Sequence, residues 1–227
     1  LLREARGVAV HVVTEAAPWR TLAKAGATAT AGQTVYIRAG TYNETLRPAN
    51  SGTAGNLITF KAYPGDECKG DSSARARQSK TDCRVVIDGQ NVRASGIILN
   101  GRNHIRIEGF DIKSNNDNPI VISNSGSLEI KGNFIHDSWT ANTAAINALG
   151  GISDTIIENN EFYDVFRAII LSWPTRADNI SIRGNHISGT FCDAIREGGN
   201  NIIIEYNWIH DPYPANDTRT VGCHRDR

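Results

Sequence analysis

Hydrophobic and polar residues alternate within short segments that recur, in nearly the same form, along the second half of the chain. Residues 128–137, 155–164, 180–189 and 202–211 are four similar copies, and residues 105–112 are a fainter fifth. Their matching positions, 110, 133, 160, 185 and 207, are 23, 27, 25 and 22 residues apart. Alternation with a period of two is typical of β-strands, and repeats of this length indicate a solenoid. Because the links are too short for a chain of hairpins, the sequence predicts an all-β fold, a right-handed parallel β-helix (solenoid).

Each coil is expected to contain three strands, with a tight corner after the first and a loop before the third. The third strands are predicted at residues 96–99, 119–122, 145–148, 168–171 and 194–197. Four corners carry Asn, which tolerates a positive φ better than most residues. Because parallel strands stack about 4.8 Å apart, these side chains could form an internal amide ladder, although turn preference alone would explain any one of them. They are Asn133, Asn160, Asn185 and Asn207.

The beginning of the chain predicts a helix over residues 18–29. Pro18 suits the first position of a helix, and Trp19, Leu22 and Ala23 share one face at the i, i+3, i+4 spacing. The open end of a β-helix exposes core and strand edges that need cover. An N-terminal capping helix is therefore expected, and a helix that binds a partner is the alternative.

Three segments near the N-terminus carry a family resemblance. Residues 31–42 (AGQTVYIRAGTY), 58–65 (ITFKAYPG) and 86–89 (VIDG) resemble the opening coils of bacterial β-helix proteins of the pectate-lyase-like superfamily. The later coils resemble the generic repeats of that superfamily, so the similarity spans roughly residues 8–211. The resemblance implies the fold and, more loosely, a lyase-like enzyme that acts on polysaccharides, since this fold hosts several activities.

Length and charge fit a single domain over residues 1–227, in which residues 96–211 form the best-defined coils. The 24 basic and 24 acidic residues balance, which gives no reason to expect a nucleic-acid partner, and no apolar run of about 18 residues indicates a membrane span. The chain begins with Leu and contains no Met, as a processed or trimmed chain would. It stops at residues 225–227, where a new third strand would start, so we expect the C-terminus to be truncated.

The four cysteines predict two disulfides. Cys68 and Cys83 bracket a polar insertion, and aligning the coils places Cys192 over Cys223. Equivalent residues of adjacent coils are about 5 Å apart, which lies within disulfide range. Two pairs favour a secreted or cell-surface protein. A zinc site is the alternative, but the chain has no Cys-x-x-Cys spacing.

Outward residues of the first strands alternate in charge from coil to coil. Stacked opposite charges are mildly stabilising, so a solvated ladder that fixes the register is the simpler interpretation. The functional alternative is a polysaccharide track in which Lys131 and Arg183 meet substrate carboxylates. The row consists of Glu108, Lys131, Glu158, Arg183 and Glu205.

Two further rows follow the second strands. Residues 116, 139, 166, 191 and 213 are mostly aromatic and suit corner packing or, alternatively, sugar stacking. The strands end in a repeated motif of His or Tyr followed by Asp, at residues 136–137, 163–164 and 210–211. Two of these residues, His136 and His210, are candidate substrate-binding residues. Asp at this place favours turns, whereas close carboxylates such as Asp137 and Asp164 could instead share Ca²⁺.

The superfamily resemblance places the cleft over the third strands, where Asn147 is a candidate substrate-binding residue. A uronate lyase needs a group that neutralises the substrate carboxylate, a base, and assistance to the departing oxygen. Arg196 or Arg167 could be the base. The candidate ligands for Ca²⁺ are Asp164, Asp193 and Glu197. A salt bridge from Asp193 to Arg167 or Arg196 is the more economical interpretation, since Arg is ordinarily charged.

The third strands also predict a partly apolar outer face, because Ile98, Val121 and Ile170 point outward. The chain has no Asp-Asp pair and no Gly-His-Gly, which disfavours a hydrolase built on paired acids, and no Lys falls on the third strands. Two functions therefore compete. One is a secreted lyase-like enzyme that acts by β-elimination on acidic polysaccharide containing uronic acids. The other is a non-catalytic carbohydrate-binding or surface scaffold module.

Overall fold

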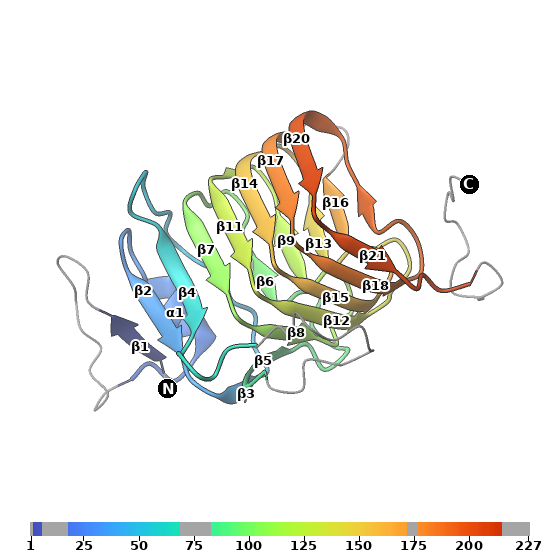
Figure 1. The fold of residues 1–227 in the computed structure, drawn as a ribbon. Helices are drawn as coiled ribbons and strands as arrows, with labels where there is room; N and C mark the ends of the chain where they lie inside the picture. The colour runs from blue at the N-terminus through green and yellow to red at the C-terminus, as the bar shows by residue number, and fades with distance from the viewer. Residues whose placement is uncertain (1, 6–17, 69–82, 172–176, 215–227) are drawn as a thin grey trace.

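The computed structural model describes residues 2–5, 18–68, 83–171 and 177–214 of the chain. Strands wind coil after coil along one axis, from β1 and β2 near the N-terminus to β20 and β21 (Figure 1). Apart from the antiparallel pair of β1 and β2, every named strand pair is parallel. The predicted parallel β-helix is confirmed.

The first strands of the coils form one long sheet, here called sheet A. Its order is β1-β2-β4-β7-β11-β14-β17-β20, and the short β10 pairs with β14. The strands are β1 (Leu2–Ala5), β2 (Thr34–Ile37), β4 (Ile58–Ala62), β7 (Ile105–Glu108), β10 (Ser125–Gly126), β11 (Leu128–Lys131), β14 (Ile152–Glu158), β17 (Ala177–Arg183) and β20 (Gly199–Glu205).

The second strands form sheet B and the third strands form sheet C. Sheet B contains β3 (Gly40–Tyr42), β5 (Val85–Asp88), β8 (Asp111–Lys113), β12 (Phe134–Ser138), β15 (Glu161–Val165), β18 (His186–Thr190) and β21 (Trp208–His210). Sheet C contains β6 (Ile97–Ile98), β9 (Ile120–Ile122), β13 (Ile146–Ala148), β16 (Ile169–Leu171) and β19 (Ile195–Arg196). All five predicted third strands are confirmed, each slightly shorter than expected.

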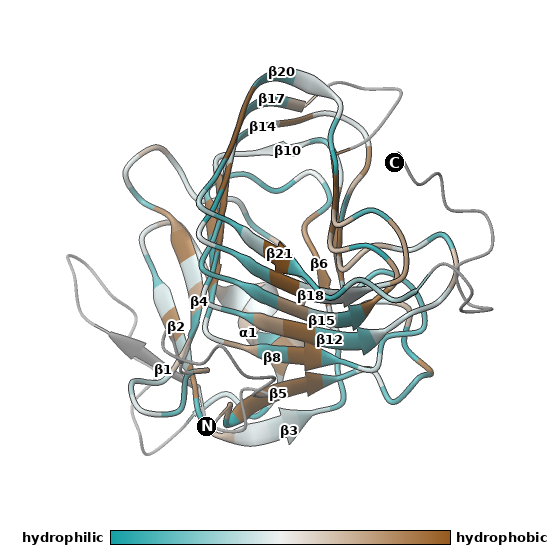
Figure 2. Ribbon diagram, turned by 45° about the vertical axis from the view of Figure 1, so that its right-hand side comes forward, coloured by the Kyte–Doolittle hydropathy of each residue, from teal (hydrophilic) through white to brown (hydrophobic). Residues whose placement is uncertain are grey.

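Alternation along each strand separates core from surface. In β11, Leu128 and Ile130 are buried in the core and Glu129 and Lys131 face outward. Figure 2 shows the strands of sheet B stacked in order, with hydrophobic stretches in β5, β8, β12, β15, β18 and β21. The core is therefore a column of apolar side chains enclosed by the three sheets.

The predicted amide ladder is confirmed at the corner between sheets A and B. The Oδ1 atom of Asn160 accepts hydrogen bonds from the backbone N and the Nδ2 of Asn133, both at 3.0 Å. In the same way, Oδ1 of Asn185 accepts from the backbone N and the Nδ2 of Asn160, and Oδ1 of Asn207 accepts from those of Asn185. Each amide in the ladder also donates to a backbone carbonyl, which satisfies polar groups that would be costly to bury alone.

The expected positive φ lies one residue earlier than predicted. Gly132 (63°), Asn159 (55°), Gly184 (62°) and Tyr206 (55°) adopt it, and the ladder asparagines do not. The residue before each Asn makes the turn, so the chain can direct the Asn side chain inward. Glycine suits two of these positions because it has no Cβ to clash.

The N-terminal capping helix is present but shorter than predicted. Helix α1 spans Leu22–Thr28, and the side chain of Thr21 caps it by accepting a hydrogen bond from the Lys24 backbone N at 3.1 Å. Pro18 therefore lies outside the helix, and Ala23 is exposed although we placed it on the buried face. Leu22 and Ala25 are buried in the solenoid core, so the helix covers the N-terminal end.

The predicted disulfide between Cys68 and Cys83 is present, with a Cα–Cα distance of 4.1 Å. It joins the ends of the polar insertion. Cys223 lies outside the described residues, so its pairing with Cys192 stays a prediction. The residues 225–227 that suggested truncation also lie outside them. No described helix is long and apolar enough to cross a membrane.

Candidate functional site

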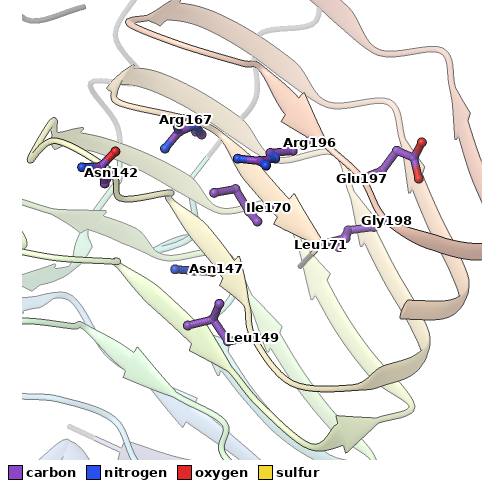
Figure 3. A pocket seen from close by; sticks show the side chains of 9 residues that line it. All are labelled: Asn142, Asn147, Leu149, Arg167, Ile170, Leu171, Arg196, Glu197 and Gly198. Carbon is purple, nitrogen blue, oxygen red and sulfur yellow. The ribbon is translucent and has the colours of Figure 1, made fainter. Parts of the chain in front are cut away.

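An open groove of about 470 Å³ lies over the outer face of sheet C (Figure 3). Strands β13, β16 and β19 form its floor, since Asn147, Ile170 and Arg196 are consecutive partners in the strand register. The groove lies over the third strands, where the superfamily resemblance implied a cleft. The groove is lined by Asn142, Asn147, Leu149, Arg167, Ile170, Leu171, Arg196, Glu197 and Gly198.

Arg167 is fixed in one wall of the groove. It follows β15 at the corner before β16, and the residue is only 6% exposed. Its Nε lies 3.3 Å from Oδ2 of Asp193, and its guanidinium carbon lies 4.7 Å from the ring centroid of Phe166. The predicted salt bridge from Asp193 is thus present for Arg167, and both contacts hold the cation in a single orientation.

Arg196 has a different environment. It is exposed at the end of β19 and points into the groove beside Ile170. Among the residues that the structure describes, it has no ion-pair or hydrogen-bond partner. A guanidinium in this state can still form a bidentate contact with a carboxylate that enters from solvent.

Asn147 adds an unused hydrogen-bond acceptor to the groove. Its Nδ2 donates to Oδ1 of Asn118 at 2.9 Å, and that oxygen also accepts from the Ala144 backbone N at 2.8 Å. The Oδ1 of Asn147 is buried and has no hydrogen-bond partner in the described part of the chain. The residue as a whole is only 7% exposed. A buried acceptor without a partner is costly, and a buried water molecule is the usual way in which proteins satisfy one.

The sequence missed the role of Asn118, which orients Asn147. The available signal was weak: an Asn directly before the third strand that begins at Pro119. Asn142, Leu149 and Gly198 were missed as well because they lie in loops outside the repeat.

The three predicted calcium ligands do not converge in this site. Asp193 is paired with Arg167, and Oδ1 of Asp164 accepts a hydrogen bond from the Tyr213 hydroxyl at 2.9 Å. Glu197 points away from Arg196 (Figure 3). Within the described residues, no three His, Cys, Asp or Glu side chains are arranged to hold a metal. This arrangement does not fit Ca²⁺, so we route no chemical step through it, and calcium binding stays a prediction.

Lys131 and Arg183 lie on sheet A rather than in the groove. The Nζ of Lys131 is 2.9 Å from a carboxylate oxygen of Glu129 and 2.9 Å from one of Glu158. Arg183 Nε is 2.8 Å from Glu158. Strand register stacks Glu108, Lys131, Glu158, Arg183 and Glu205, so the charge ladder exists as predicted.

The ladder shifts the pKa values of its members in the direction of mutual stabilisation. The hydrogen bond from Lys131 is the main reason why the pKa of Glu158 is lowered. Burial alone would lower the pKa of Lys131, but hydrogen bonds to Glu129 and Glu158 outweigh it and raise the pKa. These charges are already compensated within the protein, which favours the structural interpretation over a substrate track.

His136 lies on the outer face of sheet B, buried between two carboxylates. Its Nε2 is 2.9 Å from Oδ1 of Asp111, and its Nδ1 is 2.9 Å from Oδ2 of Asp137. Burial opposes protonation, but the hydrogen bonds to these two residues outweigh it and raise the pKa of His136 to about 9. The ring also stacks on Phe134 at 4.1 Å. The structure therefore gives His136 a paired position away from the groove.

The acidic pairs at the ends of the second strands make turns. Asp137, Asp164 and Asp211 all have a positive φ, between 47° and 52°. Strand register pairs His136 with Tyr163 and Ser138 with Val165, and it skips the Asp in both strands. Each Asp therefore makes a local turn of the backbone at the end of its strand, as the turn interpretation predicted.

The aromatic row packs the next corner. Phe166 and Phe191 are buried, and Phe191 stacks on Tyr213 with ring centroids 4.1 Å apart. Trp139 is 52% exposed. Burial of the two central rings supports corner packing rather than a sugar platform.

His210 is the second candidate that lies on sheet B. Its ring stacks on Trp208 at 4.1 Å and on His186 at 4.9 Å. Neither His210 nor His136 lines the groove, so the structure gathers only Arg167, Arg196, Asn147 and Glu197 of the predicted site residues there.

Comparisons with known proteins agree with the fold. The chain is 37% identical over 127 residues to the uncharacterized protein YwoF of Bacillus subtilis strain 168, a match that covers 54% of this chain and 25% of that protein. The match thus spans about a quarter of the length of this relative.

Two solved structures are similar at low identity. An alginate lyase from Paenibacillus sp. strain FPU-7 has a TM-score of 0.50 and 13% identity, over 88% of this chain and 75% of that one. A rhamnogalacturonan lyase has a TM-score of 0.40 and 15% identity, over 86% and 59%. The first of these supports the fold alone.

The family comparison covers most of the chain. Residues 4–196 match the family described as Pel9A-like, right handed beta helix region. This range contains all of sheet C, sheet A without β20 and the start of β1, and sheet B without β21. It also contains the amide corners up to Asn185 and every groove residue except Glu197 and Gly198. The chain therefore belongs to the Pel9A-like right-handed β-helix family.

Proposed function

We propose that this protein is a secreted polysaccharide lyase that binds uronic-acid-containing glycans in the groove over sheet C and cleaves them by β-elimination. The observation that carries the proposal is an exposed, unpaired arginine beside a fixed one in that groove. Arg196 supplies a cation that no described carboxylate neutralises, and Arg167 supplies one already oriented by Asp193. An anionic sugar chain is the ligand that best fits an open groove with this charge.

The reaction requires the proton on the carbon next to the uronate carboxylate to leave as the glycosidic bond at the β-carbon breaks. The electron pair of the C–H bond forms the new carbon–carbon double bond, and the departing glycosidic oxygen takes a proton from solvent water in the open groove. Neutralising the carboxylate acidifies that C–H bond. We assign this role to Arg167, because the Asp193 contact and the Phe166 ring hold its guanidinium in place.

Arg196 is the candidate base because it is the one exposed arginine of the pair. Arg acts as a base only when its site favours the neutral form. Asn147 lies on the floor of the groove, where its side chain would contact a bound sugar ring.

Secretion is part of the proposal, and the Cys68–Cys83 disulfide supports it. Such bonds persist in oxidising compartments outside the cytosol. A calcium requirement stays a prediction from the sequence, and comparing Ca²⁺ with a chelator in the assay measures it.

The test is an ultraviolet assay for unsaturated products over pectate, alginate and glycosaminoglycans, each with Ca²⁺ and with a chelator. We expect one acidic polymer to yield products that absorb in the ultraviolet. The matched variants are Arg196→Ala in the groove and Lys131→Ala on sheet A, which remove one cation each. Only the first should abolish product formation. No product from any polymer under either condition would reject the enzyme.

A non-catalytic carbohydrate-binding module is the second candidate, and the apolar part of the groove favours it. Ile170, Leu149 and Leu171 line the groove, and none of its described lining residues is a lysine. Apolar surface beside arginine can hold a sugar chain without cleaving it. Affinity electrophoresis on the same polymers separates the two functions: retardation without product formation, lost in Arg196→Ala, would establish the binding module.

A further inference from the structure

The outer row of sheet C continues past the groove toward the N-terminal end of the solenoid. Figure 3 shows Arg196, Ile170 and Asn147 following one another across the groove. Strand register then stacks Asn147 on Val121, and Val121 on a residue of β6. Arg47 extends the row, because the residue before it is buried and forms a parallel bridge to β6. The complete outer row is Arg47, Ile98, Val121, Asn147, Ile170 and Arg196.

The outer row has a cation at each end and uncharged side chains between them. Arg47 and Arg196 are both exposed, and neither side chain has an ion-pair or hydrogen-bond partner among the described residues. Five steps from strand to strand separate them, which is about 24 Å at the usual spacing of strands. The row therefore offers uncompensated positive charge to a ligand at two widely separated points.

The middle of the outer row presents apolar surface to solvent. Ile98, Val121 and Ile170 are only partly buried, although they are aliphatic and face outward. Leu149, another groove residue, is 45% exposed. A carboxylate that is covered by such side chains loses water and gains no partner, which is unfavourable. A methyl group in the same place gains from the contact.

Asp117 adds a negative charge beside the middle of the row. It is exposed, and its Oδ1 accepts a hydrogen bond from Nδ2 of Asn118 at 2.5 Å. Asn118 in turn accepts a hydrogen bond from Asn147 on the groove floor. Within the described chain, no basic side chain pairs with Asp117. Its charge therefore acts against any free carboxylate that lies over the central strands.

We propose that the substrate of the groove is a partly methyl-esterified uronan. Its free carboxylates meet Arg47 at one end of the row and Arg167 and Arg196 at the other, and methyl-esterified units cover the aliphatic positions between them. This inference rests on the proposed function and names its substrate class. A methyl ester removes the charge of a uronate and adds a methyl group, so one modification suits both the apolar surface and Asp117. A free-acid homopolymer would carry carboxylates along the whole row.

The unit that reacts keeps its free carboxylate, because Arg167 neutralises that group in the proposed reaction. The esters lie on units toward the N-terminal end of the row, and no bond to them forms or breaks. Cleavage is therefore the same β-elimination. The esters affect how the chain binds, and through binding they determine which bond lies beside Arg196.

The experiment compares each acidic polymer with its own methyl-esterified form on the same backbone. Pectin is demethylated in steps and alginate is methyl-esterified in steps. The ultraviolet assay then gives kcat/KM, and affinity electrophoresis gives binding. On the backbone that the protein cleaves, the partly esterified form should exceed the free acid in kcat/KM by about tenfold or more. A reaction without protein corrects for spontaneous elimination. Mass spectrometry should find methyl esters on units next to the unsaturated end, but none on the unsaturated unit.

Two variants change the charge in the middle of the row. Asp117→Asn removes the repulsion and should narrow the preference for the esterified form by about threefold. Val121→Lys places a cation among the aliphatic side chains and should reverse the preference. Val121→Thr is the matched control, since it keeps a β-branched side chain without charge and should behave as the parent does. Circular dichroism confirms that each variant is folded.

Arg47→Ala tests the far end of the row. It should weaken binding of long polymer chains by about fivefold. Oligosaccharides that span the groove but cannot reach Arg47 should bind as they do to the parent. Lys131→Ala removes a cation from sheet A and should change neither result.

Equal or faster cleavage of the free acid would overturn this inference and leave the proposed lyase intact, because product would still form. If no form of any polymer is cleaved, the lyase fails and electrophoresis still decides the inference: tighter binding of the free acid, or no binding of any form, overturns it. Self-association of the parent in light scattering, lost in Val121→Lys, would also overturn it, since a second copy of the chain would then cover the row.

Discussion

The outer faces of sheets A and C both carry basic side chains, but these side chains are paired with carboxylates on sheet A and one of them is unpaired on sheet C. On sheet A, Lys131 touches two carboxylates at 2.9 Å each, and its neighbours repeat the pattern from coil to coil. On sheet C, Arg196 extends into a groove without an acidic partner in the described chain. We therefore place the proposed site on sheet C, where one cation is uncompensated, rather than on sheet A.

Replacing Arg196 with Ala is the sharpest way to break this comparison. If the unpaired cation acts on substrate, kcat in the ultraviolet assay should fall by about a hundredfold or more. The melting temperature should hardly change, because an exposed side chain without partners adds little stability.

Lys131→Ala is the matched control, since it removes a cation of the paired kind. Unchanged activity in Arg196→Ala, measured with the substrate that the parent cleaves, would place the site on a different face.

A buried charge that is fully compensated should be visible in stability rather than activity, and His136 tests this. Its pKa is raised to about 9 in the folded chain, against about 6.5 when unfolded. The native state therefore holds the proton more tightly. This contribution is complete below about pH 6.5 and is lost as the pH rises through 9. A shift of this size corresponds to at most about 3 kcal/mol.

Urea unfolding at a series of pH values measures the effect. The free energy of unfolding should decline between about pH 6.5 and 9 in the parent and should be flatter in His136→Gln. Parallel curves for the two proteins would show that the contacts to Asp111 and Asp137 do not stabilise the protonated ring.

Arg167 should affect both activity and stability, since it lines the groove and forms an ion pair with Asp193. Removing it leaves the Asp193 carboxylate without its cation and opens space beside Phe166. Because Asp193 is partly exposed and can regain water, we expect Arg167→Ala to cost about 2 kcal/mol, below the range for fully buried pairs. Chemical denaturation gives this value.

Asp193→Asn separates the two roles of Arg167. It keeps the arginine in the groove but weakens its orientation, so stability should fall less than in Arg167→Ala, while kcat should still decrease. Equal stability losses with full activity in Asp193→Asn would mean that the pair only supports the corner.

The fold could be predicted from the sequence because every coil of a solenoid repeats the same pattern of strands and corners. Alternation, the period and the Asn corners each predicted the register, and Asn133, Asn160 and Asn185 bond to their successors as expected. Features outside the repeat were less predictable. Helix α1 begins at Leu22 rather than Pro18, and the positive φ belongs to the residue before each Asn.

The candidate site was predictable only where register determines it. The row that brings Asn147, Ile170 and Arg196 together follows from the strand alignment. The orientation of the Asn147 side chain, which leaves its Oδ1 without a partner, depends on a hydrogen bond to the loop residue Asn118. The repeat pattern does not predict this contact. His186 and His210 meet diagonally across two strands, since the register pairs His186 with Trp208 and Ser188 with His210.

The smallest expected effect concerns the compensated ladder itself. Lys131→Ala removes two ion pairs on a partly exposed face, where side-chain entropy and solvent screening offset most of the attraction. We expect a loss of about 1 kcal/mol or less in the free energy of unfolding. Because screening grows with ionic strength, the difference from the parent should shrink in about 1 M salt.

Activity should stay at the parental level in Lys131→Ala at both salt concentrations, and this result makes the variant informative. Lys131 and Arg183 are the two cations that a substrate track on sheet A would need. If Lys131→Ala lowered affinity for the polysaccharide while leaving stability unchanged, the ladder would be the binding surface. The contrast between the two faces would then be reversed. Parental activity with a small, salt-sensitive stability loss confines substrate binding to the groove, because removing a charge already neutralised by Glu129 and Glu158 changes nothing that a ligand could reach.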